Sequence, residues 1–196
     1  AVPRGGVPVG FEIAKAFGAE LDVVLVRKIG APGQPELAVG AVVDGVRPET
    51  VWNHAILDAL GLTEEALQED VKREIDEIER RRRVYIGGRP RPAIAGRTVI
   101  VVDDGIATGA TVRAALIAIR RGAPKRLLLA VPVAPPDTVE MLRAEVDELV
   151  CLQTPEPFGS ISQFYRSFPQ LTDAQVTDLL GRAVPARRAS ELSDRP

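Results

Sequence analysis

The sequence predicts an α/β fold in which a parallel sheet is flanked by helices, and three observations lead to this prediction. Apolar runs rich in β-branched residues alternate with segments whose apolar residues recur at helical spacing, which is typical of β-α-β units. Glycine or proline stands at most joins between these segments, where helices end and loops begin. The chain has 196 residues, 45% hydrophobic and 27% charged, which suits one globular domain with a substantial core.

The first predicted elements follow from periodicity. Residues 7–17 have apolar positions at helical spacing, and a glycine follows directly to end that helix. Residues 21–26 (LDVVLV) are apolar and rich in β-branched residues except for Asp22, which is typical of a strand buried on both faces of a parallel sheet. We expect a flexible loop at residues 30–35 (GAPGQP) and a second strand at residues 37–43.

A charged helix is expected at residues 63–83, inside an insertion that covers about 45–97. Thr63 is the predicted cap, acidic residues occupy the first turn, and the arginines at 80–83 occupy the last turn. Those arginines fit either a nucleic-acid contact or a solvated helix end whose charge complements the helix dipole. Acidic residues throughout the same helix favour the solvated helix end.

The second half of the chain predicts consecutive β-α-β units, and hence parallel strands. Residues 153–182 are expected to form a small hood outside the sheet, so that one domain covers residues 1–182. A polar, arginine-rich tail at 183–196 is expected to be mobile. The predicted elements are a strand at 98–102, a helix at 110–121, a strand at 126–133, a helix at 137–144 and a strand at 148–152.

Composition excludes several classes of site. One cysteine and one histidine exclude a disulfide framework and a zinc site built from those residues. No apolar run reaches the roughly 20 residues of a membrane span, and no signal-peptide pattern is found, so we expect a cytoplasmic protein. The sequence begins with Ala1 and not Met, just before a turn at residues 3–6, as if a preceding strand had been cut away, and we therefore expect a fragment or one module of a longer polypeptide.

The segment VIVVDDGIATGAT, residues 99–111, carries the strongest chemical signal. It joins a buried strand to an amphipathic helix, at the sheet edge where open α/β folds bind ligands. Its glycines permit tight turns, its small residues let backbone N–H groups converge on an anion at the helix N-terminus, and its threonines add hydroxyl donors. It lacks the Gly-Lys-Ser/Thr ending of a nucleoside-triphosphate P-loop and the GxGxxG pattern of a dinucleotide-binding fold. The cradle residues are Gly105, Ile106, Ala107, Thr108, Gly109, Ala110 and Thr111.

Two acidic residues, Asp103 and Asp104, stand directly before this cradle. Two acids here would repel a bound phosphate, so we expect them to face hydroxyl groups or a developing cation. The alternative is a structural role, in which one acid caps the turn and the other is solvated. The thirteen residues resemble the phosphoribosyl diphosphate (PRPP) binding loop of the type I phosphoribosyltransferases. Gly105 departs from that pattern, which usually has an aliphatic residue there.

The resemblance implies the Rossmann-like type I phosphoribosyltransferase fold and a reaction in which a nitrogenous base displaces pyrophosphate from PRPP. Asp103 and Asp104 would be catalytic, holding the ribose hydroxyls near the positive charge of an oxocarbenium-like transition state. Mg²⁺ is the implied cofactor, bound through PRPP and water near the two acids. Ala107 stands where hypoxanthine-guanine enzymes have a proton-accepting Asp, so a 6-oxopurine substrate is not expected.

Two further segments are candidates for binding PRPP. The sequence PRGGVP is a glycine turn that opens a helix, and the resemblance makes Arg4, Gly5 and Gly6 the pyrophosphate loop. Arg27 and Lys28 follow the predicted strand, and a similar Arg-Lys pair contacts pyrophosphate in purine and orotate enzymes, which implies a catalytic Lys28. Without the resemblance, residues 3–8 also fit an ordinary turn at the start of a helix, and Arg27 and Lys28 also fit the solvated end of a strand.

Four of the eight aromatic residues fall between residues 155 and 168 (PEPFGSISQFYRSF). Phe158, Phe164 and Tyr165 are candidates for holding a planar base between aromatic faces. The alternative is a small hydrophobic core beneath a C-terminal lid.

Three functions remain open at this point. The first is the transferase, acting on PRPP and a base as a homodimer, with neither membrane nor nucleic acid as partner. The second is a PRPP-sensing regulator that binds nucleic acid. The third is a module whose activity requires a fused partner. The regulator would use the arginines at 80–83 together with Arg89, Arg91 and Arg97.

Overall fold

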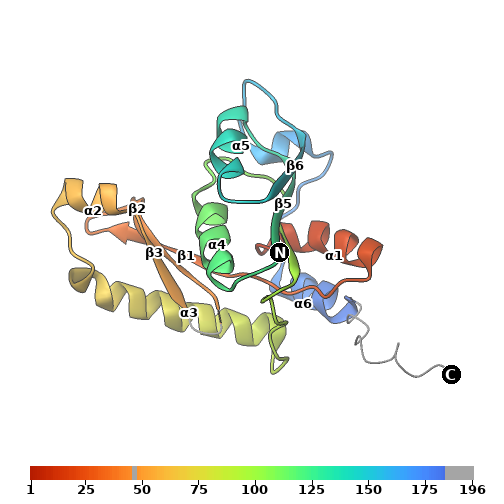
Figure 1. Ribbon diagram of the computed structural model, residues 1–196, viewed down its shortest axis with the longest axis horizontal. Helices are drawn as coiled ribbons and strands as arrows, with labels where there is room; N and C mark the ends of the chain where they lie inside the picture. Colours follow the sequence, from red (N-terminus) through yellow and green to blue (C-terminus); the bar gives the residue numbers. More distant parts are fainter. Residues whose placement is uncertain (46–47, 184–196) are drawn as a thin grey trace.

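The computed structural model describes residues 1–45 and 48–183, which form two three-stranded sheets with helices packed around them (Figure 1). The parallel sheet consists of β4 (Thr98–Val102), β5 (Arg126–Val133) and β6 (Glu148–Gln153), and the antiparallel sheet of β1 (Val26–Ala31), β2 (Gln34–Val43) and β3 (Glu49–Trp52). The helices are α1 (Gly6–Phe17), α2 (His54–Leu60), α3 (Gln68–Ile86), α4 (Ala110–Arg121), α5 (Pro136–Arg143) and α6 (Asp173–Arg182), with single 3₁₀ turns η1 (Glu65–Leu67) and η2 (Ile161–Phe164).

The parallel half confirms the predicted α/β fold. β4, α4 and β5 have the predicted bounds; α5 begins and ends one residue earlier than predicted, and β6 ends one residue later. The strand order β4-β5-β6 follows the chain order, with Val102 opposite Ala130 in the parallel register. Because parallel strands end at the same edge, the loops that follow β4 and β5 lie side by side there.

The antiparallel half departs from the prediction. The strand predicted at 21–26 is wrong for most of its length, because β1 begins only at Val26 although residues 23–25 are buried. The flexible loop predicted for GAPGQP is a hairpin instead, with strands that extend to Ala31 and resume at Gln34. Gly33, in the turn, has a φ of 76°, which glycine adopts without strain.

The predicted helix at 63–83 is divided into two elements. The Thr63 hydroxyl accepts a hydrogen bond from the Ala66 N–H at 3.3 Å, so Thr63 bonds to a residue of η1 and does not cap the long helix. The long helix α3 begins five residues later than predicted and continues to Ile86. Thr63 therefore correctly marked where the helical region starts, but its presence did not indicate that this region begins with a separate 3₁₀ turn.

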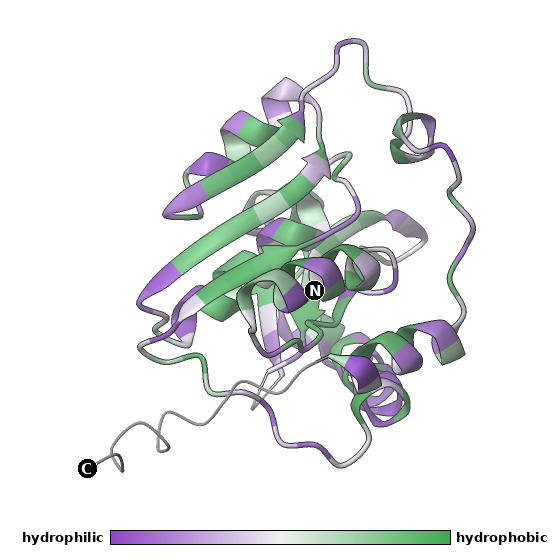
Figure 2. Ribbon diagram, turned by 90° about the vertical axis from the view of Figure 1, so that its right-hand side faces the viewer, coloured by the Kyte–Doolittle hydropathy of each residue, from purple (hydrophilic) through white to green (hydrophobic). Residues whose placement is uncertain are grey.

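Two hydrophobic clusters lie on opposite faces of the antiparallel sheet. Ala41 and Val43 face the cluster formed with β4, β5 and α4, whereas Val42 faces the cluster formed with α1, α3 and α6, as the two-residue period of a strand requires. Val39 lies in the same cluster as Val42, because the pairing of β1 with β2 shifts register at this point. Figure 1 shows the long α3 along one side of these strands and α4 along the other, and Figure 2 shows strands that are hydrophobic over most of their length.

A buried carboxylate, Asp44, joins α3 to the segment that precedes β4. Its side chain is 1% exposed and accepts hydrogen bonds from Arg82, at 2.9 Å, and from Arg91. Arg82 also contacts Asp22 at 3.2 Å and is 13% exposed. The prediction of a solvated helix end is therefore wrong for Arg82, because its partners come from segments that sequence spacing does not relate.

The remaining predictions about organisation concern the hood, the tail and membranes. α6 packs against α1 and α3, and η2 precedes it in the region expected to form the hood. The tail predicted at 183–196 falls, except for Ala183, outside the described residues. Among the described residues, no helix combines the length and the apolar character required to cross a membrane.

We predict that Asp44→Ala lowers the free energy of unfolding by about 3 kcal/mol, because it leaves Arg82 and Arg91 as half-buried cations without their shared partner. Urea unfolding measures the loss. Glu140→Ala is the matched control, since it removes one partner of an exposed ion pair and is expected to cost less than about 0.5 kcal/mol. Equal losses in the two variants would contradict this role for Asp44.

Candidate functional site

The acid pair after β4 is in direct contact with the glycine turn that opens α1. A Cβ built on Gly5 would lie 1.7 Å from Oδ2 of Asp104, and one built on Gly6 would lie 2.6 Å from the carbonyl oxygen of Val102. Only residues without a side chain permit this approach. The structure therefore brings the two predicted anion-binding segments, which are about 100 residues apart in the sequence, to one place.

Burial makes the acid pair electrostatically unusual. It raises the pKa of Asp103 to about 7, with repulsion from Asp104 as a second cause. The pKa of Asp104 is raised too, again mainly by burial. The Asp104 N–H donates to Oδ1 of Asp103 at 2.9 Å, which orients the first carboxylate. Such a pair gains from any cation or hydroxyl donor that replaces the lost water.

The cradle that follows is anchored on one side and open on the other. The Ile106 N–H donates to the Val133 carbonyl at 2.9 Å, and the Thr138 hydroxyl donates to the Ala107 carbonyl at 2.8 Å. Gly109 has a φ of 77° and directly precedes α4. Within the described part of the chain, the backbone N–H groups of residues 107–111 form no hydrogen bond, so they are available to an anion at the α4 N-terminus.

The predicted cations are placed differently from one another. Arg4 lies 3.7 Å from Asp173 in a half-exposed ion pair. Arg27 and Lys28 were predicted to follow a strand, but both lie within β1. The Arg27 guanidinium donates to Glu74 of α3 at 2.8 Å, so it is already paired on the side of the sheet that faces α3.

Lys28 lies on the opposite side of the same strand. It is exposed and stands directly across from Ala41, whose side chain belongs to the cluster formed with α4. The structure therefore separates the Arg-Lys pair, because neighbouring residues of a strand point to opposite faces.

The aromatic segment of the hood, residues 155–168, contacts the acid pair through Tyr165, whose hydroxyl donates a hydrogen bond to the Asp104 carbonyl at 2.6 Å. Phe158 and Phe164 stack on each other with ring centroids 5.4 Å apart, and Tyr165 lies 5.0 Å from Phe168. The rings therefore pack together in pairs, but none of the four is buried and none belongs to either hydrophobic cluster. Tyr165 is the base-site candidate that the structure brings into contact with the acid-pair loop.

The hood also explains the departure at Gly105. A Cβ on this residue would lie 2.7 Å from Cγ2 of Ile161 in η2 and 3.0 Å from Cγ1 of Val133. Ile161 thus occupies the space that a larger residue would need. Sequence reasoning missed Ile161, Thr138 and the buried Glu74, and no local pattern marks them, because each acts through a partner distant in the sequence.

Comparison with known proteins identifies the family. A family model described as the phosphoribosyl transferase domain matches residues 1–168, which include the acid pair, the cradle and the glycine turn at residues 3–8. This chain belongs to the phosphoribosyl transferase domain family. The match ends at Phe168, so it covers the aromatic segment of the hood, residues 155–168, but not α6.

Two curated members of the family are similar to this phosphoribosyl transferase domain over most of its length. They are Mycobacterium tuberculosis proteins provisionally named phosphoribosyl transferases MT0597 (strain CDC 1551 / Oshkosh) and Rv0571c (strain ATCC 25618 / H37Rv). Each is 44% identical over 183 residues, or 93% of this chain, and the chain spans 41% of their length. The crystal structure of TT1426 from Thermus thermophilus superposes with a TM-score of 0.77 at 42% identity, covering 94% of this chain and 86% of that one.

We predict that Asp103→Asn raises Tm at pH 8.5. Because the pKa of Asp103 is raised in the folded protein, the folded state is fully stabilised by protonation below about pH 4, and this contribution is lost as pH rises to about 7. The advantage of Asn should therefore shrink between pH 7 and pH 4. Thermal unfolding across pH 4–9 measures it, with Asp58→Asn on the exposed face of α2 as the control. A lower Tm for Asp103→Asn at pH 8.5 would rule out a destabilising ionised Asp103.

Proposed function

We propose that this phosphoribosyl transferase domain transfers the 5-phosphoribosyl group of PRPP to a nitrogenous base and releases pyrophosphate. The observation that carries the proposal is the contact of Gly5 and Gly6 with the acid pair, which joins two candidate anion-binding turns across two carboxylates. PRPP has a phosphate at one end, a diphosphate at the other and ribose hydroxyls between them. The order of charges along the site matches the order of groups along this substrate.

Each part of the site then has a distinct role. The cradle at residues 105–111 binds the 5-phosphate through free N–H groups, and the carboxylates of Asp103 and Asp104 accept hydrogen bonds from the ribose hydroxyls. As the bond from C1 to the diphosphate oxygen breaks, positive charge develops on the ribose beside these carboxylates. Arg4 leaves its half-exposed pair with Asp173 to contact the departing diphosphate, and Lys28 is the second candidate cation.

The donor set fits Mg²⁺ that is held mainly by the substrate. The described residues contain no cluster of three or more histidine, cysteine or acidic side chains able to hold a metal ion, but the acid pair offers hard oxygen ligands. The remaining ligands would come from PRPP and water. When bound, Mg²⁺ supplies neutralisation of the diphosphate charge.

The base would lie between the acid pair and the hood. Tyr165 supports this location because its hydroxyl donates to the Asp104 carbonyl, and Phe168 packs 5.0 Å from its ring. Phe158 and Phe164, which stack on each other, are the further aromatic candidates in the same segment. Ala107 provides no carboxylate to accept a proton from a 6-oxopurine. We therefore propose another nitrogenous base as acceptor, in a nucleotide-salvage reaction carried out by a cytoplasmic homodimer.

The regulator is less well supported, because the arginines it requires have intramolecular partners. Arg80 and Arg81 both donate to Glu77 at 2.7 Å, and these hydrogen bonds lower the pKa of Glu77 to about 2. Arg89 donates to the carbonyls of Ile86 and Leu180. The other partners are Asp22 and Asp44 for Arg82, Asp44 for Arg91, and Glu20 for Arg97.

We predict PRPP-dependent and Mg²⁺-dependent release of pyrophosphate with at least one base in a panel of purines and pyrimidines. Asp104→Asn should lower turnover on the order of a hundredfold, since it removes charge stabilisation beside the reacting carbon while leaving the fold intact. Asp58→Asn is the control at an exposed acid. Wild-type activity in Asp104→Asn would defeat the assignment, and salt-sensitive nucleic-acid binding without turnover would favour the regulator.

We further predict that Gly5→Ala weakens PRPP binding at least tenfold, because the added methyl group must displace the Asp104 carboxylate. Isothermal titration calorimetry measures the affinity in the absence of a base. Gly88→Ala is matched to it, because a Cβ there meets no atom within 4 Å and Gly88 has no positive φ. Equal affinities for both variants and the wild type would show that PRPP does not use this contact.

A further inference from the structure

Thr138, near the start of α5, connects this helix to the anion-binding cradle. It is buried, with 6% of the residue exposed, and its hydroxyl donates a hydrogen bond to the Ala107 carbonyl at 2.8 Å. A threonine in a helix commonly donates to a carbonyl of its own preceding turn. Thr138 donates instead across 31 residues of sequence, to the loop that follows the neighbouring strand β4. The bond therefore joins the unit formed by β5 and α5 to the cradle between β4 and α4.

The start of α5 is a rigid support for this bond. Only Ala134 and Pro135 separate the helix from β5, and the helix begins at Pro136, so two prolines restrict the backbone where the chain turns. Ala134 is fully buried, and its N–H donates to the Gln153 carbonyl of β6 at 3.2 Å. Thr138 is thus held in a fixed place relative to both strands.

The cradle, by contrast, contains glycines that leave its backbone free to rotate, at Gly105 and Gly109. One face of α5 lies against the second of them. A Cβ built on Gly109 would lie 2.8 Å from Cε of Met141 and 3.0 Å from Cγ2 of Thr138, and these two side chains share a helix face because they are three residues apart. Thr138 therefore meets the cradle twice, with its methyl group at Gly109 and with its hydroxyl at Ala107.

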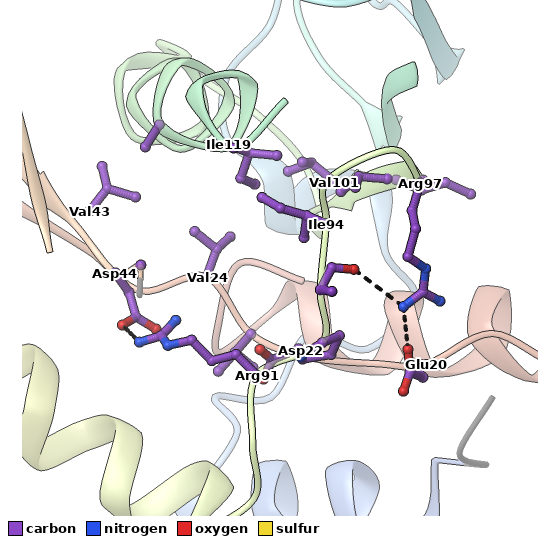
Figure 3. Close-up of a pocket in the computed structure, with 18 of the residues that line it drawn as sticks. Glu20, Asp22, Val24, Val43, Asp44, Arg91, Ile94, Arg97, Val101 and Ile119 are labelled. Atoms are coloured by element: carbon purple, nitrogen blue, oxygen red, sulfur yellow. Dashed lines mark hydrogen bonds and ion pairs between the residues drawn. The ribbon is translucent and has the colours of Figure 1, made fainter. Parts of the chain in front are cut away.

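The other side of β4 offers the cradle no comparable support. An apolar groove of about 780 Å³ borders the beginning of this strand, and its lining includes Ile94, Val101 and Ile119 (Figure 3). Of the described residues that line the groove, none belongs to the cradle or to α5. Among the described strands, β4 is at the edge of its sheet and pairs with β5 alone. The position of the cradle therefore depends on its hydrogen bonds to β5 and α5.

One peptide unit connects the Thr138 bond to the anion-binding side of the cradle. The peptide bond between Ala107 and Thr108 is trans, so the Ala107 carbonyl and the Thr108 N–H point in opposite directions. Because Thr138 holds the carbonyl, the Thr108 N–H points away from α5. Within the described chain this N–H has no hydrogen-bond partner. Rotation of the peptide would instead turn the carbonyl oxygen, with its partial negative charge, toward a bound anion.

We propose that Thr138 is a positioning residue, which fixes the direction of the Thr108 N–H toward the 5-phosphate of PRPP. It acts on the substrate only through the planar peptide between Ala107 and Thr108. The hydroxyl is the required group, since the methyl contact at Gly109 does not hold the carbonyl. This inference rests on the proposed function, because the phosphate assigned to the cradle is the ligand that the N–H contacts.

Thr138→Val tests the hydroxyl, because valine keeps the branched shape of threonine and lacks the donor. We expect PRPP binding in the presence of Mg²⁺ to weaken about tenfold in isothermal titration calorimetry, since one donor to a charged group is no longer directed. Pyrophosphate, which is assigned to the turn at Gly5, should bind unchanged, whereas a general loss of structure would weaken both ligands. Thr138→Ser keeps the hydroxyl and should bind PRPP nearly as the wild type does.

Thr177→Val is the matched control. The Thr177 hydroxyl also donates to a backbone carbonyl, that of Asp173 at 2.9 Å, but the residue is exposed on α6. This variant should leave PRPP affinity unchanged. A second readout is the amide NMR signal of Thr108, which should shift on addition of PRPP in the wild type and in Thr138→Ser, and much less in Thr138→Val.

The outcomes separate this inference from the proposed function. PRPP binding by Thr138→Val as tight as by the wild type, or a wild-type Thr108 amide that does not respond to bound PRPP, would overturn the role of Thr138 alone. A loss in Thr138→Ser equal to that in Thr138→Val would also overturn it, by assigning the effect to packing at Gly109. A wild-type protein that binds neither PRPP nor pyrophosphate would contradict the proposed function, and this inference with it.

Discussion

The contact between the Gly5 turn and the Asp104 carboxylate is the constraint on which the rest of the site depends. It requires a residue without a side chain, and it removes water from the acid pair, which raises the pKa of Asp103. The Tyr165 hydroxyl holds the same loop by donating a hydrogen bond to the Asp104 carbonyl. The charged groups are therefore held in place before any ligand arrives, and the folded state bears the electrostatic cost of that arrangement.

How much could be predicted from the sequence differs between the two halves of the chain. The parallel half has short, strongly patterned elements bounded by glycine and proline, so β4, α4 and β5 were predicted residue by residue. In the first half, burial and strand pairing do not coincide: residues 23–25 are apolar because they are buried in the core, while pairing begins at Val26. The hairpin at Gly33 was predicted as a flexible loop because glycine and proline are typical both of flexible loops and of the tight turns of hairpins.

The candidate site shows the same division. The acid pair and cradle are continuous in sequence, so a motif could locate them. The distribution of ion pairs could not be predicted, because Arg27 pairs with Glu74 and Arg82 with Asp44 across 47 and 38 residues. The packing of Phe158 against Phe164 depends likewise on how the hood folds back, which composition does not determine.

The contact between Gly105 and Ile161 has a consequence for sequence variation in the family. The loop and the hood share one fixed volume at this point, so a methyl group gained at position 105 must be lost at position 161 or at Val133. Homologues with an aliphatic residue in the loop are then expected to carry a smaller residue in the hood. The two positions should vary together, as a pair of compensating sizes, and a graft of either segment from a relative would need the other to be transferred with it.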